Sequence, residues 1–117
     1  MRVTVYGIPS CGTVKKALAA LREAGREVDF IDLRQAPPER ARVVRWVQKF
    51  GTRAMRNLSG GSYRALGPER EVWSDEAWIA AFVSDPMLLK RPIVERGGVP
   101  ILVGWNHSES EIAAAFG

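Results

Sequence analysis

The chain has 117 residues with a net charge of +4, from 17 Lys and Arg against 13 Asp and Glu. This length predicts one domain, and no apolar run approaches the ~20 residues of a transmembrane helix. The N-terminus lacks the features of a secretory signal, so we expect a cytoplasmic protein with no membrane partner. Positive and negative residues are interspersed, which favours a solvated surface over direct binding of nucleic acid, although a local basic pocket for a small anion stays open.

The sequence contains one cysteine, Cys11, and one histidine, His107. These numbers exclude an internal disulfide and argue against a zinc site with Cys and His ligands. We therefore expect no metal and no tightly bound cofactor. Any disulfide that Cys11 forms needs a thiol from another molecule.

The N-terminal part has the pattern of a β-α-β unit. A strand is predicted over Arg2–Tyr6, broken by Gly7–Ser10, and a second strand over Glu27–Leu33. Between them we predict a helix from about Gly12 to Ala24, which Gly25 ends. Its apolar residues recur at helical spacing, namely Val14, Ala17, Leu18 and Leu21.

The middle of the chain is predicted to be helical. Pro37 and Pro38 would open a second helix, because proline is tolerated in the first turn, and Gly51 would end it. A third helix is expected near Ser74, where Trp73 and Trp78 have the spacing of a hydrophobic staple. The apolar stripes of the two helices are Val43, Trp46, Val47 and Phe50, then Ala77, Trp78, Ala81 and Phe82. The segment 51–67 between them predicts irregular structure.

Two strands and a last helix are predicted at the C-terminal end. The runs Pro92–Val94 and Val99–Val103 flank a turn with two glycines, which indicates an antiparallel hairpin. Ser108–Glu111 matches a capping box that begins a helix. The order β-α-β, helical insertion, β-β-α predicts an α/β fold with a mixed four-stranded sheet, as in thioredoxin. We expect one domain over residues 1–117, with the insertion at about 37–85.

Cys11 is the first candidate for chemistry, because it lies between the first strand and the first helix. Unpaired N–H groups and the helix dipole favour an anion at a helix start, which promotes the reactive thiolate. Lys15 and Lys16, one turn on, add positive potential. The alternative is a small buried apolar cysteine. The Pro-Ser-Cys-Gly context, outside any apolar stripe, favours the reactive thiol.

Arg91 and Pro92 are the second candidate, at the start of the third strand. An X-Pro bond can be cis, and the planar Arg guanidinium binds an oxyanion or carboxylate bidentately. An ordinary arginine at a strand edge is the alternative.

The segment 55–64, which includes Arg64, mixes hydrogen-bond donors with glycines and is either a flap over the cysteine or a surface loop. It lacks the phosphate-binding P-loop pattern.

Three stretches together resemble the arsenate reductase/Spx/YffB family, and most of all its YffB-like branch. They are the cysteine stretch Val5–Ala17, the Arg-Pro stretch Lys90–Ile93 and the strand stretch Gly98–Trp105. The resemblance implies a thioredoxin-like fold with a helical insertion. It implies that Cys11 is the nucleophile, that Arg91 binds the oxyanion, and that Pro92 is the cis-proline.

The resemblance also implies an activity. It predicts a thiol-dependent reductase that uses one cysteine at a helix N-terminus, with glutathione as co-substrate and glutaredoxin as partner. Cys11 is the predicted catalytic residue of a monomer. The residues predicted to bind a small anionic or thiol substrate are Gly12, Thr13, Lys15, Arg64, Arg91 and Pro92.

The chain departs from the family pattern in two respects. Arsenate reductases of this type carry further pocket arginines, which would fall near Ser59 and Gly104–Trp105 in this sequence. Spx-type regulators often carry a Cys-x-x-Cys switch, but Val14 stands at its second position. Two alternatives to the glutathione-linked reductase therefore remain: arsenate reduction proper, and an Spx-like regulator without catalysis that binds RNA polymerase or another protein.

Overall fold

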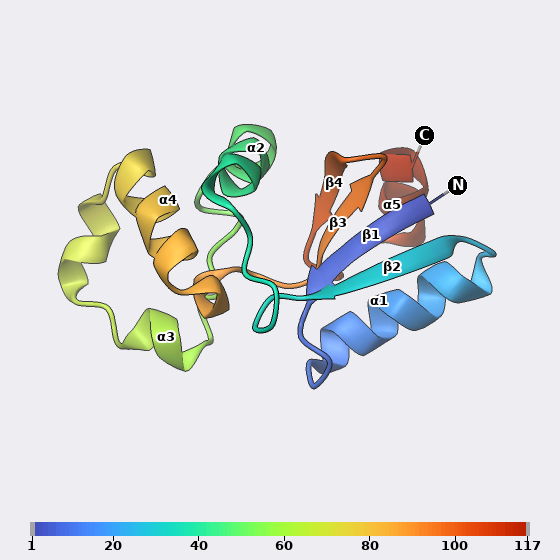
Figure 1. Cartoon of the computed structure of the whole chain (residues 1–117), viewed down its shortest axis with the longest axis horizontal. Coiled ribbons are helices and arrows are strands. Elements are labelled where there is room, and N and C mark those ends of the chain that lie inside the picture. Colours follow the sequence, from blue (N-terminus) through green and yellow to red (C-terminus); the bar gives the residue numbers. More distant parts are fainter. Residues whose placement is uncertain (1, 117) are drawn as a thin grey trace. The chain divides into compact units, whose positions relative to one another are not determined.

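The computed structural model describes residues 2–116, which form two compact units (Figure 1). We call them the sheet unit, made of Met1–Asp32 and Arg91–Gly117, and the helical unit, made of Leu33–Lys90. Among the described residues, no helix is long and apolar enough to cross a membrane.

The sheet unit contains a four-stranded mixed sheet in the order β2-β1-β3-β4. Its strands are β1 (Arg2–Gly7), β2 (Glu27–Asp32), β3 (Ile93–Arg96) and β4 (Val99–Val103). β1 pairs in parallel with β2, whereas β1 with β3 and β3 with β4 are antiparallel. The predicted mixed α/β sheet is therefore confirmed.

Helices α1 (Gly12–Glu23) and α5 (Glu109–Phe116) pack on one face of this sheet. The apolar side chains that they bury with the strands form one cluster: Val3, Val5, Leu21, Val94, Leu102 and Phe116. This face follows from the strand alternation of Val3 and Val5, which are both fully buried. Gly25 ends α1 with a φ of +78°, as predicted.

Four strand boundaries differ from the prediction. Gly7 still pairs with Asp32 and so belongs to β1, whereas Leu33 lies beyond β2. Pro92 precedes β3 rather than opening it, because a proline has no N–H to give to the ladder. β3 in turn extends to Arg96, so the hairpin loop is the two glycines 97 and 98, with φ of +58° and +80°. A two-residue loop with both φ positive is the turn that matches the strand twist.

The helical unit contains three α-helices and two 3-10 helices. These are α2 (Arg40–Phe50), α3 (Gly61–Arg64), η1 (Pro68–Val72), α4 (Asp75–Ser84) and η2 (Pro86–Leu88). Its largest fully buried side chains are Trp46, Trp78, Phe82, Leu33, Met55 and Leu89. Pro37 and Pro38 precede α2 and do not open it, since Glu39 is the N-cap residue. The prediction also missed α3 and both 3-10 helices, which are too short to show a periodic pattern.

The start of α4 follows its sequence signals closely. The Ser74 hydroxyl accepts a hydrogen bond from Ala77 N at 3.1 Å, as an N-cap serine should. Trp73 and Trp78 meet edge to face, with ring centroids 4.9 Å apart. The predicted hydrophobic staple is therefore confirmed. The predicted insertion at 37–85 lies inside the helical unit, and its place within a single domain stays a prediction.

Candidate active site

Gly7 sets the start of α1 against the end of β1. A Cβ at this position would lie 2.6 Å from Cγ2 of Val14, which is fully buried. Only the absence of a side chain lets the first turn of α1 approach the strand so closely. The loop 8–11 is short for this reason, and it places Cys11 directly beyond the end of β1.

Cys11 is the N-cap residue of α1, with φ −79° and ψ 122°. Its thiol forms no capping hydrogen bond to the N–H groups of α1 within the described residues. Its backbone is fixed on both sides: Cys11 N donates to Ile8 O at 3.2 Å, and Lys15 N donates to Cys11 O at 3.0 Å. The N–H groups of Gly12 and Thr13 precede that first helical bond and are available to an anion. Cys11 itself is half-buried, on a backbone that these hydrogen bonds fix on both sides.

The sheet brings Arg91 and Pro92 to the same end as Cys11. β1 and β3 are the two central strands, and Tyr6 pairs with Ile93. The loop to Cys11 therefore leaves the sheet where the chain from Arg91 and Pro92 enters it. The Arg91–Pro92 peptide bond is cis, as the resemblance implied, and Pro92 is buried.

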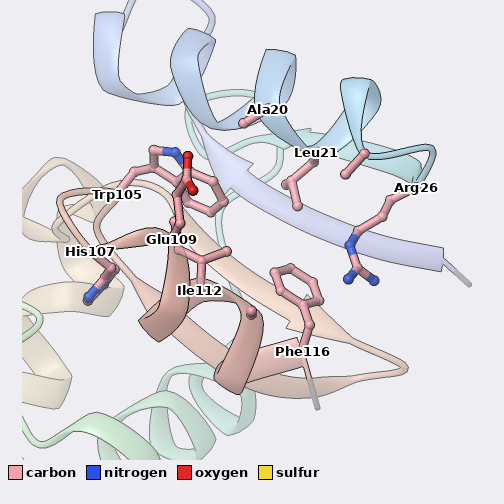
Figure 2. A pocket seen from close by; sticks show the side chains of 10 residues that line it. Ala20, Leu21, Arg26, Trp105, His107, Glu109, Ile112 and Phe116 are labelled. Carbon is pink, nitrogen blue, oxygen red and sulfur yellow. The ribbon is translucent and has the colours of Figure 1, made fainter.

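Gly104 closes this end of the sheet. Its N–H donates to Pro92 O at 2.8 Å, and its φ of +78° suits glycine rather than a residue with a side chain. The expected second pocket arginine is thus absent from a position where the backbone itself favours glycine. Trp105, the next residue, is half-buried and lies between α1 and α5 (Figure 2).

The remaining predicted site residues divide between the two units. Thr13 and Lys15 are exposed on the first turns of α1, in the sheet unit with Cys11. Arg64 belongs to the helical unit, where its Nη1 donates to Ser59 O at 2.6 Å. This bond ties the end of α3 back to the loop that precedes it within the segment 55–64. Its role as a flap stays a prediction.

The helical unit contains a cationic group that the sequence did not reveal. The Arg56 guanidinium lies 4.2 Å from the ring centroid of Trp78, and its Nη2 donates to Thr52 Oγ1 at 3.2 Å. A cavity of about 200 Å³ next to it is lined also by Lys90. Arg56 and Trp78 are 22 residues apart in the sequence, so no local pattern could have predicted this stack. Within residues 2–116, no cluster of three His, Cys, Asp or Glu side chains could hold a metal ion.

The family model of the ArsC family matches residues 6–113. The chain belongs to the ArsC family. Protein YusI of Bacillus subtilis (strain 168), an uncharacterized protein, is 31% identical over 115 residues, which cover 95% of this chain and 97% of YusI. An arsenate reductase of Escherichia coli (strain K12) is 31% identical over 94 residues, covering 79% of this chain and 67% of the enzyme.

Solved structures of ArsC relatives have the same fold. The YFFB (PA3664) protein superposes with a TM-score of 0.85 at 30% identity, covering 98% of this chain and 99% of that one. A possible arsenate reductase from Streptococcus mutans UA159 gives 0.84 at 30% identity, covering 95% and 97%. The resemblance to arsenate reductase-like, YffB-type proteins is thereby confirmed, and so is the thioredoxin-like fold. At the family level, ArsC proteins are thiol-dependent reductases.

Proposed function

We propose that this ArsC-family protein is a thiol-dependent reductase in which Cys11 is the single nucleophile and glutathione is the co-substrate. The observation that carries the proposal is the position of Cys11 as the N-cap residue of α1, half-buried and without a capping bond from its thiol to the described helix. A thiol at this place adjoins the positive end of the helix dipole and the N–H groups of the first turn, which can hold a negatively charged substrate beside the sulfur.

The rest of the site suits a small anionic substrate. Gly12 and Thr13 offer N–H groups from the first turn of α1, and Lys15 adds positive charge. Arg91 enters the same end of the sheet, where its guanidinium can bind an oxyanion or a carboxylate. The first turn of α1 and the Arg91 guanidinium would together hold the negative charge of glutathione or of an oxyanion next to the Cys11 sulfur.

A single cysteine determines the order of events. The Cys11 thiolate attacks one sulfur of a glutathione mixed disulfide, a Cys11–glutathione disulfide forms, and the other thiolate leaves. A thiolate of glutaredoxin then attacks the sulfur of the bound glutathione. The glutathione passes to glutaredoxin, the Cys11–sulfur bond breaks, and the Cys11 thiolate is regenerated. Both electrons come from the external thiols, because the chain has no second cysteine to supply them.

The proposal is tested by incubation with oxidised glutathione followed by mass spectrometry. We expect one glutathione per chain, removed by glutaredoxin with glutathione, and none on Cys11→Ser. A matched control is the double variant Cys11→Ser/Ser10→Cys, which keeps one thiol but moves it to the exposed position before the N-cap. Modification of the double variant should be at least about tenfold slower, because its thiol precedes the first turn of α1, whose N–H groups would hold the negatively charged disulfide beside the Cys11 sulfur.

Two outcomes would contradict the proposal. One is equal reaction rates for Cys11 and for the displaced thiol, which would mean that the helix start does not activate the sulfur. The other is that the chain forms no glutathione adduct, while RNA polymerase captures both the parent chain and Cys11→Ser. That result would favour the regulator without catalysis.

A further inference from the structure

A cavity of about 540 Å³ lies inside the sheet unit, between the second half of α1 and helix α5 (Figure 2). Its volume is in the range of small-molecule sites, about 300–1,000 Å³. None of its lining residues belongs to the predicted site around Cys11, which lies at the opposite end of α1. The cavity is therefore a separate feature of the fold.

The cavity has an apolar wall that is continuous with the protein core. Leu21 and Phe116, both at least 95% buried, belong to the core cluster and also line the cavity. Ile112 and the indole of Trp105 complete this wall and are half-buried (Figure 2). Such a wall favours a ligand with an apolar body, and the aromatic rings of Trp105 and Phe116 suit a flat one, since the apolar surface that they cover is removed from water.

Arg26 provides a positive charge at one end of the cavity. Its guanidinium carbon lies 4.0 Å from the ring centroid of Phe116, a stacked cation–π contact. No carboxylate or hydrogen-bond acceptor among residues 2–116 is bonded to the Arg26 side chain, whereas Arg2 on β1 pairs with both Glu27 and Asp29. The stack occupies one face of the guanidinium, and the N–H groups in its plane, which have no acceptor among the residues that the structure describes, can pair with a carboxylate.

The other end of the cavity has the opposite charge. Glu109 lies there, away from Arg26, beside Trp105 and His107 (Figure 2). The His107 ring is already engaged, with Nε2 3.2 Å from Val103 O and Nδ1 3.7 Å from the Glu111 carboxylate. A ligand with one carboxylate would be attracted to Arg26 and repelled by Glu109, so the two ends select one orientation.

We propose that this cavity binds a small monocarboxylate with a flat apolar body. The carboxylate pairs with Arg26, and the body lies against Leu21, Ile112 and Phe116. The inference does not depend on the reductase proposal, because neither Cys11 nor Arg91 takes part.

The probe for this site is 2-naphthoate, titrated into the ¹⁵N-labelled chain and followed by amide chemical shifts. We expect saturable shifts confined to the end of α1, Trp105 and α5, and the same affinity in Cys11→Ser. The neutral analogue 2-naphthamide should bind about tenfold more weakly, which is the loss expected for one charge-assisted hydrogen-bonded pair. Equal affinity for the two compounds would overturn the role of the carboxylate, and shifts elsewhere would overturn the site.

Variants separate the charge from the shape of the cavity. Arg26→Gln should weaken 2-naphthoate about tenfold and leave 2-naphthamide unchanged. Because this change also removes the stack on Phe116, a second pair of variants is needed. Ala113→Leu adds bulk to the cavity lining from α5 and should abolish binding, whereas Ala114→Leu makes the same change at the next position, which is equally exposed but lies outside the lining. Equal binding by these two variants would contradict the proposal.

Discussion

At the scale of single residues, two glycines determine the geometry around Cys11. Gly7 permits the contact of β1 with Val14, and Gly104 turns the chain with a positive φ and bonds to Pro92 O. Neither glycine offers a functional group. Their contribution is to let backbone segments approach, which fixes the ends of β1 and β4 at the site.

The contact at Gly7 leads to a prediction about stability. Gly7→Ala would place a methyl group 2.6 Å from Cγ2 of Val14, and a buried valine has no free rotation to avoid it. We expect the free energy of unfolding to fall by about 1–3 kcal/mol, the usual cost of overpacking. Urea denaturation measures this change.

Gly12→Ala is the matched control for this prediction. A Cβ at Gly12 meets no described atom within 4 Å, and alanine is the better helix former. This variant should be as stable as the parent or slightly more stable. If both variants lose the same stability, the close approach at Gly7 is not the cause.

Some of the contacts around Cys11 could be predicted from the sequence, and others could not. The place of Cys11 at a helix start was predictable, because a strand pattern, a break and a helical stripe follow one another around it. The packing of Gly7 on Val14 and the stack of Arg56 on Trp78 were not, since both depend on the exact approach of backbones. That Cys11 and Arg91 lie at the same end of the sheet could be predicted only from the expected strand topology, because the two residues are far apart in the sequence.

At the scale of elements, helix α5 begins with a complete capping box. Glu111 N donates to Ser108 Oγ at 3.2 Å, and Ser108 N donates to Glu111 Oε1 at 3.2 Å. The backbone hydrogen bond from Ser108 lowers the pKa of Glu111 below its usual 4.5, and the Ser108 hydroxyl and His107 act in the same direction. The bonds favour the ionised carboxylate in the folded chain.

This pKa shift predicts a specific dependence on pH. Because the folded-state pKa of Glu111 is lowered, its stabilisation is complete above the ordinary value of 4.5 and is lost as the pH falls through the folded value. We expect amide exchange in α5 to speed up between about pH 5 and about pH 3, beyond the intrinsic effect of acid on exchange. Hydrogen exchange of residues 112–116 measures it.

Glu111→Gln is the control for the acid effect. Glutamine keeps a side-chain oxygen that can accept from Ser108 N, as in other capping boxes, but it has no charge to lose. The variant should start with a slightly weaker α5 at pH 7 and show a smaller change toward pH 3. A pH profile identical to that of the parent would show that another carboxylate causes the loss.

The elements that the sequence predicted share strong local signals. Ser74 and Ser108 cap helices, Gly25 and Gly51 end them with positive φ, and the apolar stripes of α1 and α4 face the cores. The missed elements have no such signals. α3 has four residues and cannot show two helical turns, and the prolines before α2 are equally compatible with an extended lead-in.

At the scale of the whole molecule, the chain combines two compact units of different composition. The sheet unit carries Cys11, Arg91 and the α1/α5 cavity, and its core combines aliphatic strand residues with Leu21 of α1 and Phe116 of α5. The helical unit is built around Trp46 and Trp78. The resemblance to the YFFB (PA3664) protein covers 98% of this chain, so both units belong to the family fold.

The whole chain has one thiol, and this number limits its oxidised forms. Cys11 cannot form a disulfide within the chain, so a thiol oxidant without glutathione leaves only a bond between two copies of the protein or oxidation of a single sulfur. With glutathione present, the small thiol reaches the half-buried sulfur more easily than a second protein does.

We therefore predict two distinct products of diamide treatment. Without glutathione, a covalent dimer should form slowly, and its yield should rise with protein concentration because the reaction joins two chains. With an excess of glutathione, the monomeric adduct should replace it almost completely. Non-reducing electrophoresis and intact mass spectrometry distinguish the products, and Cys11→Ser should give neither. A dimer yield that is independent of protein concentration would show that two Cys11 sulfurs already face each other in a preformed pair, which would contradict a monomer that presents its thiol to small substrates.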